Sequence, residues 1–328
     1  MKIVMNRLKQ LEIINQDSLI QNIPEGYVKV GVLYCGVCRT DAKMWDQGHR
    51  DLVLPRILGH EMVVRDTHGN RFMVWPGTNC TTCRHCRRGL ENLCENMKIM
   101  GFHLDGGFAS HMVVPSPNLI PLPTGLESPT ACFGEPMGCI VNAFEKIQYE
   151  KKSRLLIYGG GTMGLATALY AKSMGLQPLI IEKNESKIHH VRPFLDAAGI
   201  CCKKGTRESG FDLVINACPD VNAFCQAISK VARAGWIVFF SGIAKNEAID
   251  TNILNLIHYK EVKIAGAYGM TLTHMEKAIP FMISHQSYLK LLIQDIVPPP
   301  SLPALMPQVL SGKGLKYILD FTLASRSP

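Results

Sequence analysis

The stretch Arg154–Glu182, RLLIYGGGTMGLATALYAKSMGLQPLIIE, decides the fold of this chain. Its first apolar run, Leu155–Tyr158, predicts a strand that enters a glycine-rich turn, and the alanine-rich segment after the turn has helical spacing. A second apolar run, Leu179–Ile181, ends in Glu182. This order of strand, tight turn, helix, strand and acid predicts an α/β Rossmann unit, a parallel doubly wound sheet that binds a dinucleotide. The alternative is a glycine-rich turn in some other α/β protein.

The glycines of this turn have separate predicted roles. Gly159 would make the sharp turn, Gly161 would let a pyrophosphate approach the backbone, and Gly164 would let the helix pack on the strand. The free amides at the start of the helix, at Thr162 and Met163, favour phosphate groups. The carboxylate of Glu182 can then accept hydrogen bonds from a ribose diol.

Size and composition set the broad class. The 328 residues suggest two domains, and the apolar content of 47% is ample for two cores. The net charge of +8 could serve an anionic cofactor, nucleic acid or no specific partner, so charge alone decides little. No apolar run approaches the roughly 20 residues of a spanning helix, and the N-terminus lacks a signal-peptide core, so we expect a soluble, cytoplasmic protein.

Two short segments near the N-terminus carry zinc-ligand residue types. Cys35–Asp41, CGVCRTD, follows the predicted strand Tyr27–Tyr34 and is expected to be a polar loop, and Leu58–Glu61, LGHE, comes later. A catalytic zinc takes three protein groups and leaves one position for water or substrate. Taken singly, a cysteine is more often a small buried residue, and a His-Glu pair is more often a surface feature.

The sharpest signal is a run of four cysteines in a loop rich in Arg, Gly, Asn and Thr. The pattern C-x2-C-x2-C-x7-C comprises Cys80, Cys83, Cys86 and Cys94. Four thiolates that close a tetrahedron predict a structural zinc site, against the alternative of unmetallated or redox cysteines. The basic neighbours suit a nucleic-acid module, but we prefer the interpretation that they offset the negative charge of the site.

The rest of the chain continues the α/β alternation and then returns to β structure. Phe211–Asn216 and Trp236–Phe240 read as buried strands, joined by a helix over Val221–Ala232. Val262–Gly266 is the last strand that we place in this sheet, and Leu315–Phe321 closes the chain as a strand.

Taken together, these pieces resemble the zinc-dependent medium-chain alcohol dehydrogenases, and within them the sorbitol and threonine dehydrogenase branch. The resemblance runs from about residue 26 to the C-terminus. It depends on an ordered set of motifs: CGVCRTD, GHE, the four-cysteine spacing, DGGFA, GEP, GGGTMG and IHYKE.

The resemblance implies a split catalytic domain. Residues 1–143 would form a GroES-like β-rich domain that carries the structural zinc lobe at 80–94, and residues 266–328 would return to it. Residues 144–265 would be the inserted Rossmann domain.

The resemblance also implies the catalytic zinc site. Cys38 and His60 would hold the ion, with Glu61 and Glu135 as carboxylate neighbours, and which glutamate binds zinc directly stays open. Thr40 would hydrogen-bond the substrate oxygen.

The cofactor contacts follow from the same resemblance. Arg39 matches a position that often contacts the pyrophosphate, and Lys187 matches one that contacts the adenosine ribose. The implied cofactors are two zinc ions per chain, one catalytic and one structural, and NAD, with NADP possible because Lys183 stands beside Glu182.

One departure concerns the proton relay. Lys43 stands where the family commonly has a histidine that passes the proton to solvent, so His49 or a water chain are alternatives.

The function that follows is hydride transfer between a secondary alcohol, polyol or amino alcohol and a nicotinamide cofactor, and we expect a homodimer or homotetramer. The first alternative is a zinc-stabilised, dinucleotide-sensing or nucleic-acid-binding protein without catalysis, although we expect no nucleic-acid or membrane partner. The second is a zinc-free quinone reductase of the same superfamily.

Overall fold

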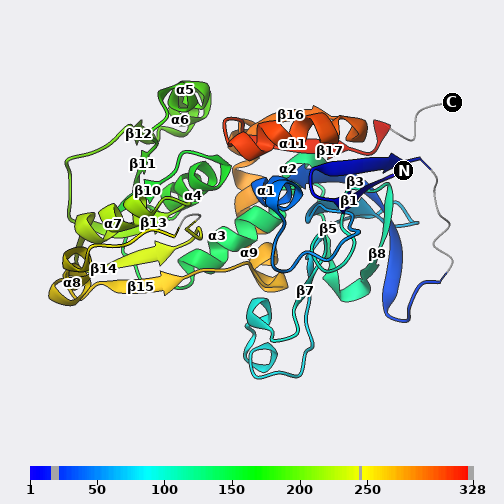
Figure 1. Cartoon of the computed structure of the whole chain (residues 1–328), viewed down its shortest axis with the longest axis horizontal. Helices are drawn as coiled ribbons and strands as arrows, with labels where there is room; N and C mark the ends of the chain where they lie inside the picture. The colour runs from blue at the N-terminus through cyan, green and yellow to red at the C-terminus, as the bar shows by residue number, and fades with distance from the viewer. Residues whose placement is uncertain (16–21, 244–245, 324–328) are drawn as a thin grey trace. The chain divides into compact units, whose positions relative to one another are not determined.

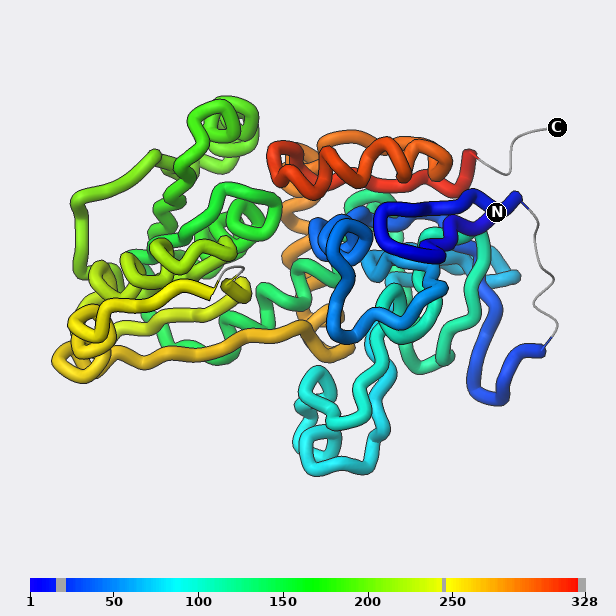
Figure 2. The backbone as a smooth tube through the Cα atoms, in the orientation of Figure 1, coloured from blue at the N-terminus to red at the C-terminus, as the bar shows by residue number. Residues whose placement is uncertain are grey.

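The computed structural model describes residues 1–15, 22–243 and 246–323, which form two compact units. The first unit combines Met1–Gly138 with Met270–Pro328, and the second is the continuous segment Cys139–Gly269 (Figure 1). Figure 2 shows that the blue and cyan N-terminal part and the red C-terminal part belong to the same unit. The sequence places the junctions after residues 143 and 265, and the two units meet after residues 138 and 269.

The second unit contains six parallel strands in the order β12-β11-β10-β13-β14-β15. This is the order of a dinucleotide-binding Rossmann sheet, so the predicted fold class is confirmed. Its elements are β10 (Arg154–Tyr158), α4 (Thr162–Ser173), β11 (Gln177–Ile181), α5 (Glu185–His190), α6 (Arg192–Ala198), β12 (Cys201–Lys203), β13 (Phe211–Asn216), α7 (Val221–Lys230), β14 (Val231–Phe239), α8 (Thr251–Tyr259) and β15 (Lys263–Gly266).

The predicted helix over Val221–Ala232 extends two residues too far. Helix α7 ends at Lys230, and Val231 already pairs with Phe211 of β13 as the first residue of β14. Val231 is buried in the core of this unit, so tertiary packing overrides the helical spacing of the sequence.

The first unit is built on a seven-stranded sheet in the order β16-β17-β3-β4-β5-β9, with β8 paired to β3. Only β16 and β17 are parallel, and the other pairs are antiparallel. Two separate two-stranded sheets pair β1 with β2 and β6 with β7. The strands of the unit are β1 (Lys2–Arg7), β2 (Gln10–Ile14), β3 (Tyr27–Val37), β4 (Glu61–Arg65), β5 (Arg71–Val74), β6 (Gly77–Thr78), β7 (Lys98–Ile99), β8 (His111–Pro115), β9 (Leu119–Pro121), β16 (Ile293–Val297) and β17 (Lys316–Asp320).

The first unit also contains α-helices and short 3-10 helices. Their bounds are α1 (Arg39–Gln47), η1 (Cys86–Arg88), η2 (Glu91–Leu93), η3 (Ser116–Asn118), α2 (Ser128–Ala131), α3 (Gly134–Phe144), α9 (Leu272–Ser284), α10 (Gln286–Lys290), η4 (Pro299–Ser301) and α11 (Leu302–Ser311). Helix α3 carries the chain across the first junction. No helix of the described residues is long and apolar enough to cross a membrane.

The prediction of a polar loop over Cys35–Asp41 is wrong. Strand β3 continues to Val37, because Cys35, Gly36 and Val37 pair with β17 from the C-terminal part of the chain. Helix α1 begins at Arg39 directly afterwards, so only Cys38 lies between strand and helix.

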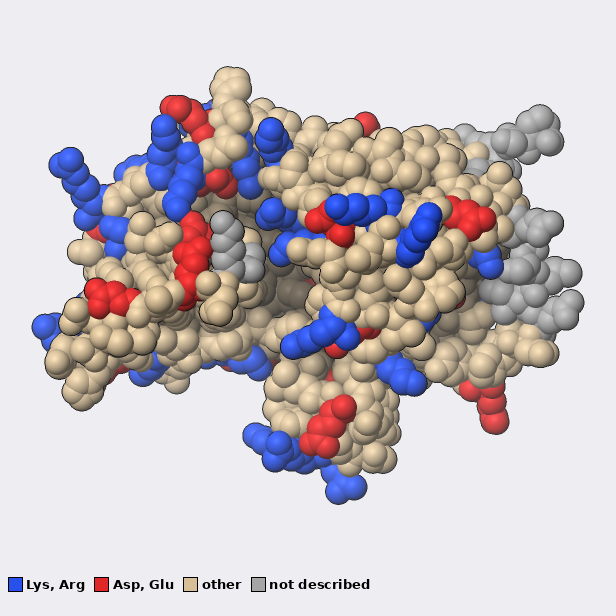
Figure 3. Space-filling view, viewed as in Figure 1, with Lys and Arg blue, Asp and Glu red and all other residues tan. Residues whose placement is uncertain are grey.

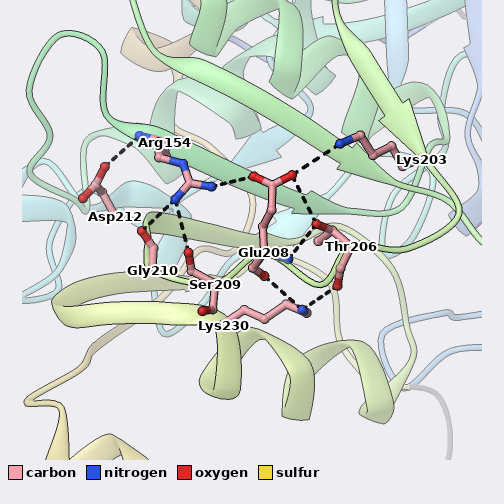
Figure 4. A network of polar contacts seen from close by, with 8 residues as sticks. All are labelled: Arg154, Lys203, Thr206, Glu208, Ser209, Gly210, Asp212 and Lys230. Carbon is pink, nitrogen blue, oxygen red and sulfur yellow. Dashed lines mark hydrogen bonds and ion pairs between the residues drawn. The ribbon is translucent and has the colours of Figure 1, made fainter.

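The connection between β12 and β13 contains no helix, and the side chains of Arg154, Lys203 and Lys230 donate hydrogen bonds to it (Figure 4). Glu208 accepts hydrogen bonds from Arg154 at 2.7 Å and from Lys203 at 3.3 Å. Lys230 Nζ donates to the carbonyls of Thr206 and Glu208. This network of ion pairs and hydrogen bonds links the connection to β10, β12 and the end of α7.

Candidate functional site

Cys38 occupies the N-cap of helix α1. Its Sγ accepts a hydrogen bond from Thr40 N at 3.4 Å, and Asp41 Oδ2 accepts one from Cys38 N at 2.8 Å. This reciprocal pair is a capping box with a thiol in the place of the usual hydroxyl. The cap fixes the thiol at the junction between the end of β3 and the start of the helix.

His60 directly precedes strand β4, and the backbone conformation of Gly59 fixes its position. Gly59 has φ +93°, and a Cβ there would lie 2.5 Å from the Phe108 ring, so only glycine fits. His60 is buried, and its Nδ1 lies 3.2 Å from Oδ1 of the fully buried Asp41, although the angle is not that of a hydrogen bond. Burial lowers the pKa of His60, but the neighbouring Asp41 and Cys38 outweigh it and raise the pKa well above its ordinary value. Asp41 is therefore the acidic neighbour of this imidazole.

Cys38, His60 and Glu61 form one cluster. Their candidate ligand atoms, a thiol sulfur, an imidazole nitrogen and a carboxylate oxygen, all lie within 4.8 Å of one another. These donor types at these separations fit a zinc ion with one open position. Glu135, in the first turn of α3, is half-buried and is not a member of this cluster.

Sequence reasoning missed Lys316, a cation that pairs directly with Glu61 of this cluster. Its Nζ donates to Glu61 Oε2 at 2.6 Å and to Oε1, and it is buried on β17. Burial opposes the charge of Lys316, but Glu61, with Cys38 and Glu135, raises its pKa above the ordinary value. A lysine that begins the mostly apolar strand Lys316–Asp320 is the signal that could have found it.

The four cysteines of the lobe between β6 and β7 also form one cluster. Their sulfur atoms lie within 4.8 Å of one another, with Cys83 Sγ 3.5 Å from Cys86 Sγ. Backbone amides donate to the sulfurs, for example Cys83 N to Cys80 Sγ at 3.3 Å. Hydrogen bonds from the backbone of Cys83 and Thr82 lower the pKa of Cys80 to about 5, while burial raises the pKa of Cys94. Four convergent sulfurs with amide donors fit a closed zinc site.

The surface of this lobe is mainly basic at its tip. Figure 3 shows Lys and Arg side chains gathered there, with acidic side chains on the face toward the viewer. Arg84 lies 3.6 Å from Glu95, so one of the basic side chains has an acidic partner within the lobe.

In the second unit, the glycine turn follows β10 as predicted. Gly159 has φ +109°, and a Cβ there would lie 2.9 Å from Ala217 O. A Cβ on Gly164 would lie 1.9 Å from Gly159 O, so this glycine lets α4 pack closely on the turn. Gly161 is the N-cap of α4 and offers no side-chain cap, which leaves the amides of the first turn, including Thr162 and Met163, free for an anion.

Glu182 ends β11 beside this turn. Its Oε2 accepts from Gly160 N at 3.0 Å and lies 3.2 Å from Lys187 Nζ, and its Oε1 accepts from Asn184 N at 3.0 Å. Burial opposes its charge, but these amides and the Lys187 ammonium lower the pKa of Glu182 below its ordinary value. The carboxylate is therefore ionised and positioned next to the glycine turn at neutral pH. Lys183 points to a different partner, Asp220 Oδ2 at 2.6 Å.

Comparison with known proteins places this geometry in a family. Residues 24–124 match the family described as the alcohol dehydrogenase GroES-like domain. The chain is 27% identical over 313 residues to D-altritol 5-dehydrogenase of Agrobacterium fabrum. The aligned residues make up 88% of this chain and 93% of that protein. It is 26% identical over 314 residues to sorbitol dehydrogenase of Halalkalibacterium halodurans, covering 89% of this chain and 91% of that protein. Over most of its length, the chain is therefore similar to zinc-type medium-chain alcohol dehydrogenases.

Solved structures agree with this fold. Galactitol-1-phosphate dehydrogenase of Escherichia coli superposes with a TM-score of 0.85 at 19% identity, over 97% of this chain and 99% of that chain. Acetophenone reductase of Geotrichum candidum, in complex with NAD, superposes with a TM-score of 0.84 at 22% identity. The superposition covers 98% of this chain and 97% of that chain. At these identities the likeness shows the fold, and it confirms the GroES-like and Rossmann architecture.

The predicted site residues fall into both units. Cys38, Thr40, His60, Glu61 and Glu135 lie in the first unit. Arg39 belongs there too, and its Nε donates to Leu310 O at 3.2 Å. The predicted cofactor residues of the glycine turn, with Glu182 and Lys187, lie in the second unit.

Proposed function

We propose that this chain is a zinc- and nicotinamide-dependent dehydrogenase that oxidises a secondary alcohol of a polyol or related polyhydroxylated compound. The observation that carries the proposal is the convergence of Cys38, His60 and Glu61, which the nucleic-acid and quinone reductase alternatives leave without a role. The relatives' names, D-altritol 5-dehydrogenase, sorbitol dehydrogenase and L-galactonate-5-dehydrogenase, support a polyhydroxylated substrate.

The proposed catalytic site uses the residues of the first unit. Cys38 and His60 would hold zinc, with Glu61 or Glu135 as the third protein ligand and Asp41 keeping the imidazole in orientation. When bound, zinc supplies Lewis-acid activation of the substrate hydroxyl, and the nicotinamide accepts the hydride. The Thr40 hydroxyl, in the first turn of α1, would accept the proton of the substrate hydroxyl. Phe102, whose ring centroid lies 5.3 Å from that of His60, would exclude water from the imidazole.

NAD is the proposed cofactor. The ionised Glu182 carboxylate suits a ribose diol and repels a 2′-phosphate. Lys183, which would favour the phosphate, is already paired with Asp220 at 2.6 Å. Lys187 supports the carboxylate and would contact the same ribose.

A homo-oligomer is the proposed assembly, and strand β15 is its proposed interface. This strand is the last of its sheet, and among the described residues its outer edge has no strand partner. Exposed apolar side chains lie on and beside it: Leu254, Tyr259, Ile264 and Tyr268. A second copy that pairs antiparallel with β15 would satisfy the edge and obey two-fold symmetry.

The cytoplasm is the proposed compartment. All twelve cysteines are free thiols, which suits a reducing environment.

The proposed activity is tested by zinc analysis and by a reduction screen with NAD and NADP over alcohols, polyols and sugar acids. We expect about two zinc ions per chain and reduction of NAD. The variant Cys38→Ser should lose turnover and one zinc ion while it still binds NADH by fluorescence. Cys225→Ser, outside both clusters, is the matched control. A zinc-free chain, or a Cys38→Ser variant with full turnover, would refute the proposal.

A further inference from the structure

A groove outside the sites described above lies on the first unit, between strand β16 and helix α11. These two elements, with β17, are orange and red segments in Figure 1. The volume of the groove is about 280 Å³. Small-molecule pockets usually measure about 300–1,000 Å³, so the groove suits a small ligand. None of the residues that line it belongs to the zinc clusters or to the glycine turn.

A bulge in β16 brings two polar side chains to this groove. Successive side chains of a strand normally point to opposite faces of the sheet. The pairing of β16 with β17 shifts in register between Ile293 and Asp295, and both Gln294 and Asp295 line the groove. Tyr317 of β17 is the register partner of Asp295 and lines it too. The strand side therefore presents a carboxylate, a carboxamide and a phenol together.

One face of α11 forms the opposite wall of the groove. Ser301, the N-cap residue, is followed by Ala304 and Leu305, and Gln308 comes one turn later. Residues three or four positions apart share one helix face. The small side chains of Ser301 and Ala304 leave space, and the buried Leu305, with Val297 of β16, supplies apolar surface.

The polar groups of the groove keep unused hydrogen-bonding capacity. Gln308 Oε1 accepts a hydrogen bond from Tyr317 OH at 3.3 Å, which leaves the amide hydrogens of Gln308. Asp295 Oδ1 accepts one from Ile296 N at 2.8 Å. Among the residues that the structure describes, Asp295 has no cation partner and the Ser301 hydroxyl has no hydrogen-bond partner. The groove therefore offers an acceptor, a donor and a hydroxyl that can do both.

We propose that this groove binds a neutral polyhydroxylated small molecule, a sugar or a sugar alcohol. Each hydroxyl of such a ligand both donates and accepts, which matches the mixed polar groups of the groove. The Asp295 carboxylate accepts from two neighbouring hydroxyls, while Gln308 and Ser301 donate to others. The C–H groups of the ligand contact Val297 and Leu305. The inference does not depend on the proposed function, because the groove shares no residue with the zinc cluster.

Charged ligands fit the groove less well. Among the described residues that line it, none is a lysine, an arginine or a histidine, so an anion would meet only the charge of Asp295. An ammonium ion would pair with Asp295 but would leave the Ser301 and Gln308 donors without acceptors. A neutral ligand rich in hydroxyls satisfies the carboxylate and the donors together.

The test is a titration followed by NMR of 13C-labelled alanine and valine methyl groups in the full, zinc-loaded chain without nicotinamide. The probes are sorbitol and myo-inositol, with ethylammonium chloride and sodium acetate as comparators. We expect the Ala304 and Val297 methyl resonances, assigned from Ala304→Ser and Val297→Ile, to shift and saturate with the two polyols alone. The same shifts are expected in Cys38→Ser, which separates the groove from the zinc cluster.

Two variants test the residues of the groove. Asp295→Ala should weaken sorbitol binding roughly 10- to 100-fold, because hydrogen bonds to a charged group are lost. Ala304→Phe should abolish binding, because it fills the groove from an exposed helix position. Glu25→Ala, which removes an exposed carboxylate from the turn before β3, is the matched control and should keep the wild-type affinity.

Specific binding must be separated from the general effect of polyols, which are excluded from protein surfaces and act without saturating. A response that stays linear, or an affinity that neither Asp295→Ala nor Ala304→Phe changes, would overturn the proposal. Saturable binding of ethylammonium or acetate in place of the polyols would overturn the ligand class. The dehydrogenase screen decides the proposed function separately, because none of these titrations requires turnover.

Discussion

Lys316 Nζ lies 2.6 Å from Glu61 Oε2, and both side chains are buried in the first unit. The two residues are 255 positions apart in the sequence. Gly36 makes this contact possible, because a Cβ on it would lie within 2.1 Å of Glu61 Oε2. The pair therefore joins the proposed zinc cluster to the C-terminal strand.

The variant Lys316→Met should destabilise the protein, because it leaves the Glu61 carboxylate buried and unpaired. Breaking a buried pair on one side costs about 3–5 kcal/mol of the free energy of unfolding. Zinc would neutralise the same carboxylate, so we expect a smaller loss in zinc-loaded protein than in chelated protein. Urea unfolding in both states measures the difference.

The double variant Glu61→Gln with Lys316→Met serves as the control for this pair. It removes both charges, and in chelated protein it should recover much of the stability that Lys316→Met loses. Equal losses for Lys316→Met with and without zinc would show that Glu61 does not meet the ion.

The variant Cys94→Ser should release zinc from the lobe without removing the ion at Cys38. Cys94 receives hydrogen bonds from the amides of Cys80 and Asn96, so its loss opens the sulfur cluster. Zinc content should fall from about two to about one ion per chain, since a structural site needs all four ligands. Elemental analysis together with limited proteolysis of the lobe measures this. Retention of both ions would place the second zinc elsewhere.

The variant Glu182→Gln should weaken NAD binding roughly 10- to 100-fold. A hydrogen bond to a charged group contributes about 1.5–3 kcal/mol, and about 1.4 kcal/mol is a factor of ten in affinity. Glu185→Gln, an exposed residue paired with Lys204, is the control. Adding Asp220→Asn frees Lys183 and should improve NADP binding. Fluorescence titration with NADH and NADPH compares them, and an unchanged NADH affinity in Glu182→Gln contradicts the ribose assignment.

The variant Glu208→Gln should lower the melting temperature by one or a few degrees at pH 7. The Lys203 and Arg154 cations lower the pKa of Glu208, so the carboxylate stabilises the fold above its unfolded pKa of about 4.3. This contribution is lost as pH falls through the lower, folded value. The difference in melting temperature between variant and wild type should therefore shrink below about pH 4 in a calorimetric series. A constant difference would mean that the network in Figure 4 acts through packing rather than charge.

The sequence predicts the nucleotide-binding unit well because its signals are local. Gly159, Gly164 and Glu182 lie within one strand, turn, helix and strand, where spacing alone fixes neighbours. The cluster of Cys80–Cys94 is local in the same sense.

What the sequence did not predict depends on distant partners. Cys35–Val37 looks like a polar loop until β17 pairs with it, and Lys316 looks like an ordinary strand residue until Glu61 lies beside it. Both contacts join the start of the chain to its end, and no pattern within a window of residues encodes them.

Strand β17 lies between β16 and β3, so the first sheet cannot be completed until Lys316–Asp320 have been synthesised. On a ribosome, Met1–Gly138 would emerge with the edge of β3 bare, whereas the continuous Rossmann segment already holds every strand of its own sheet. The Rossmann segment is therefore expected to complete its sheet before the N-terminal part, although it is synthesised later.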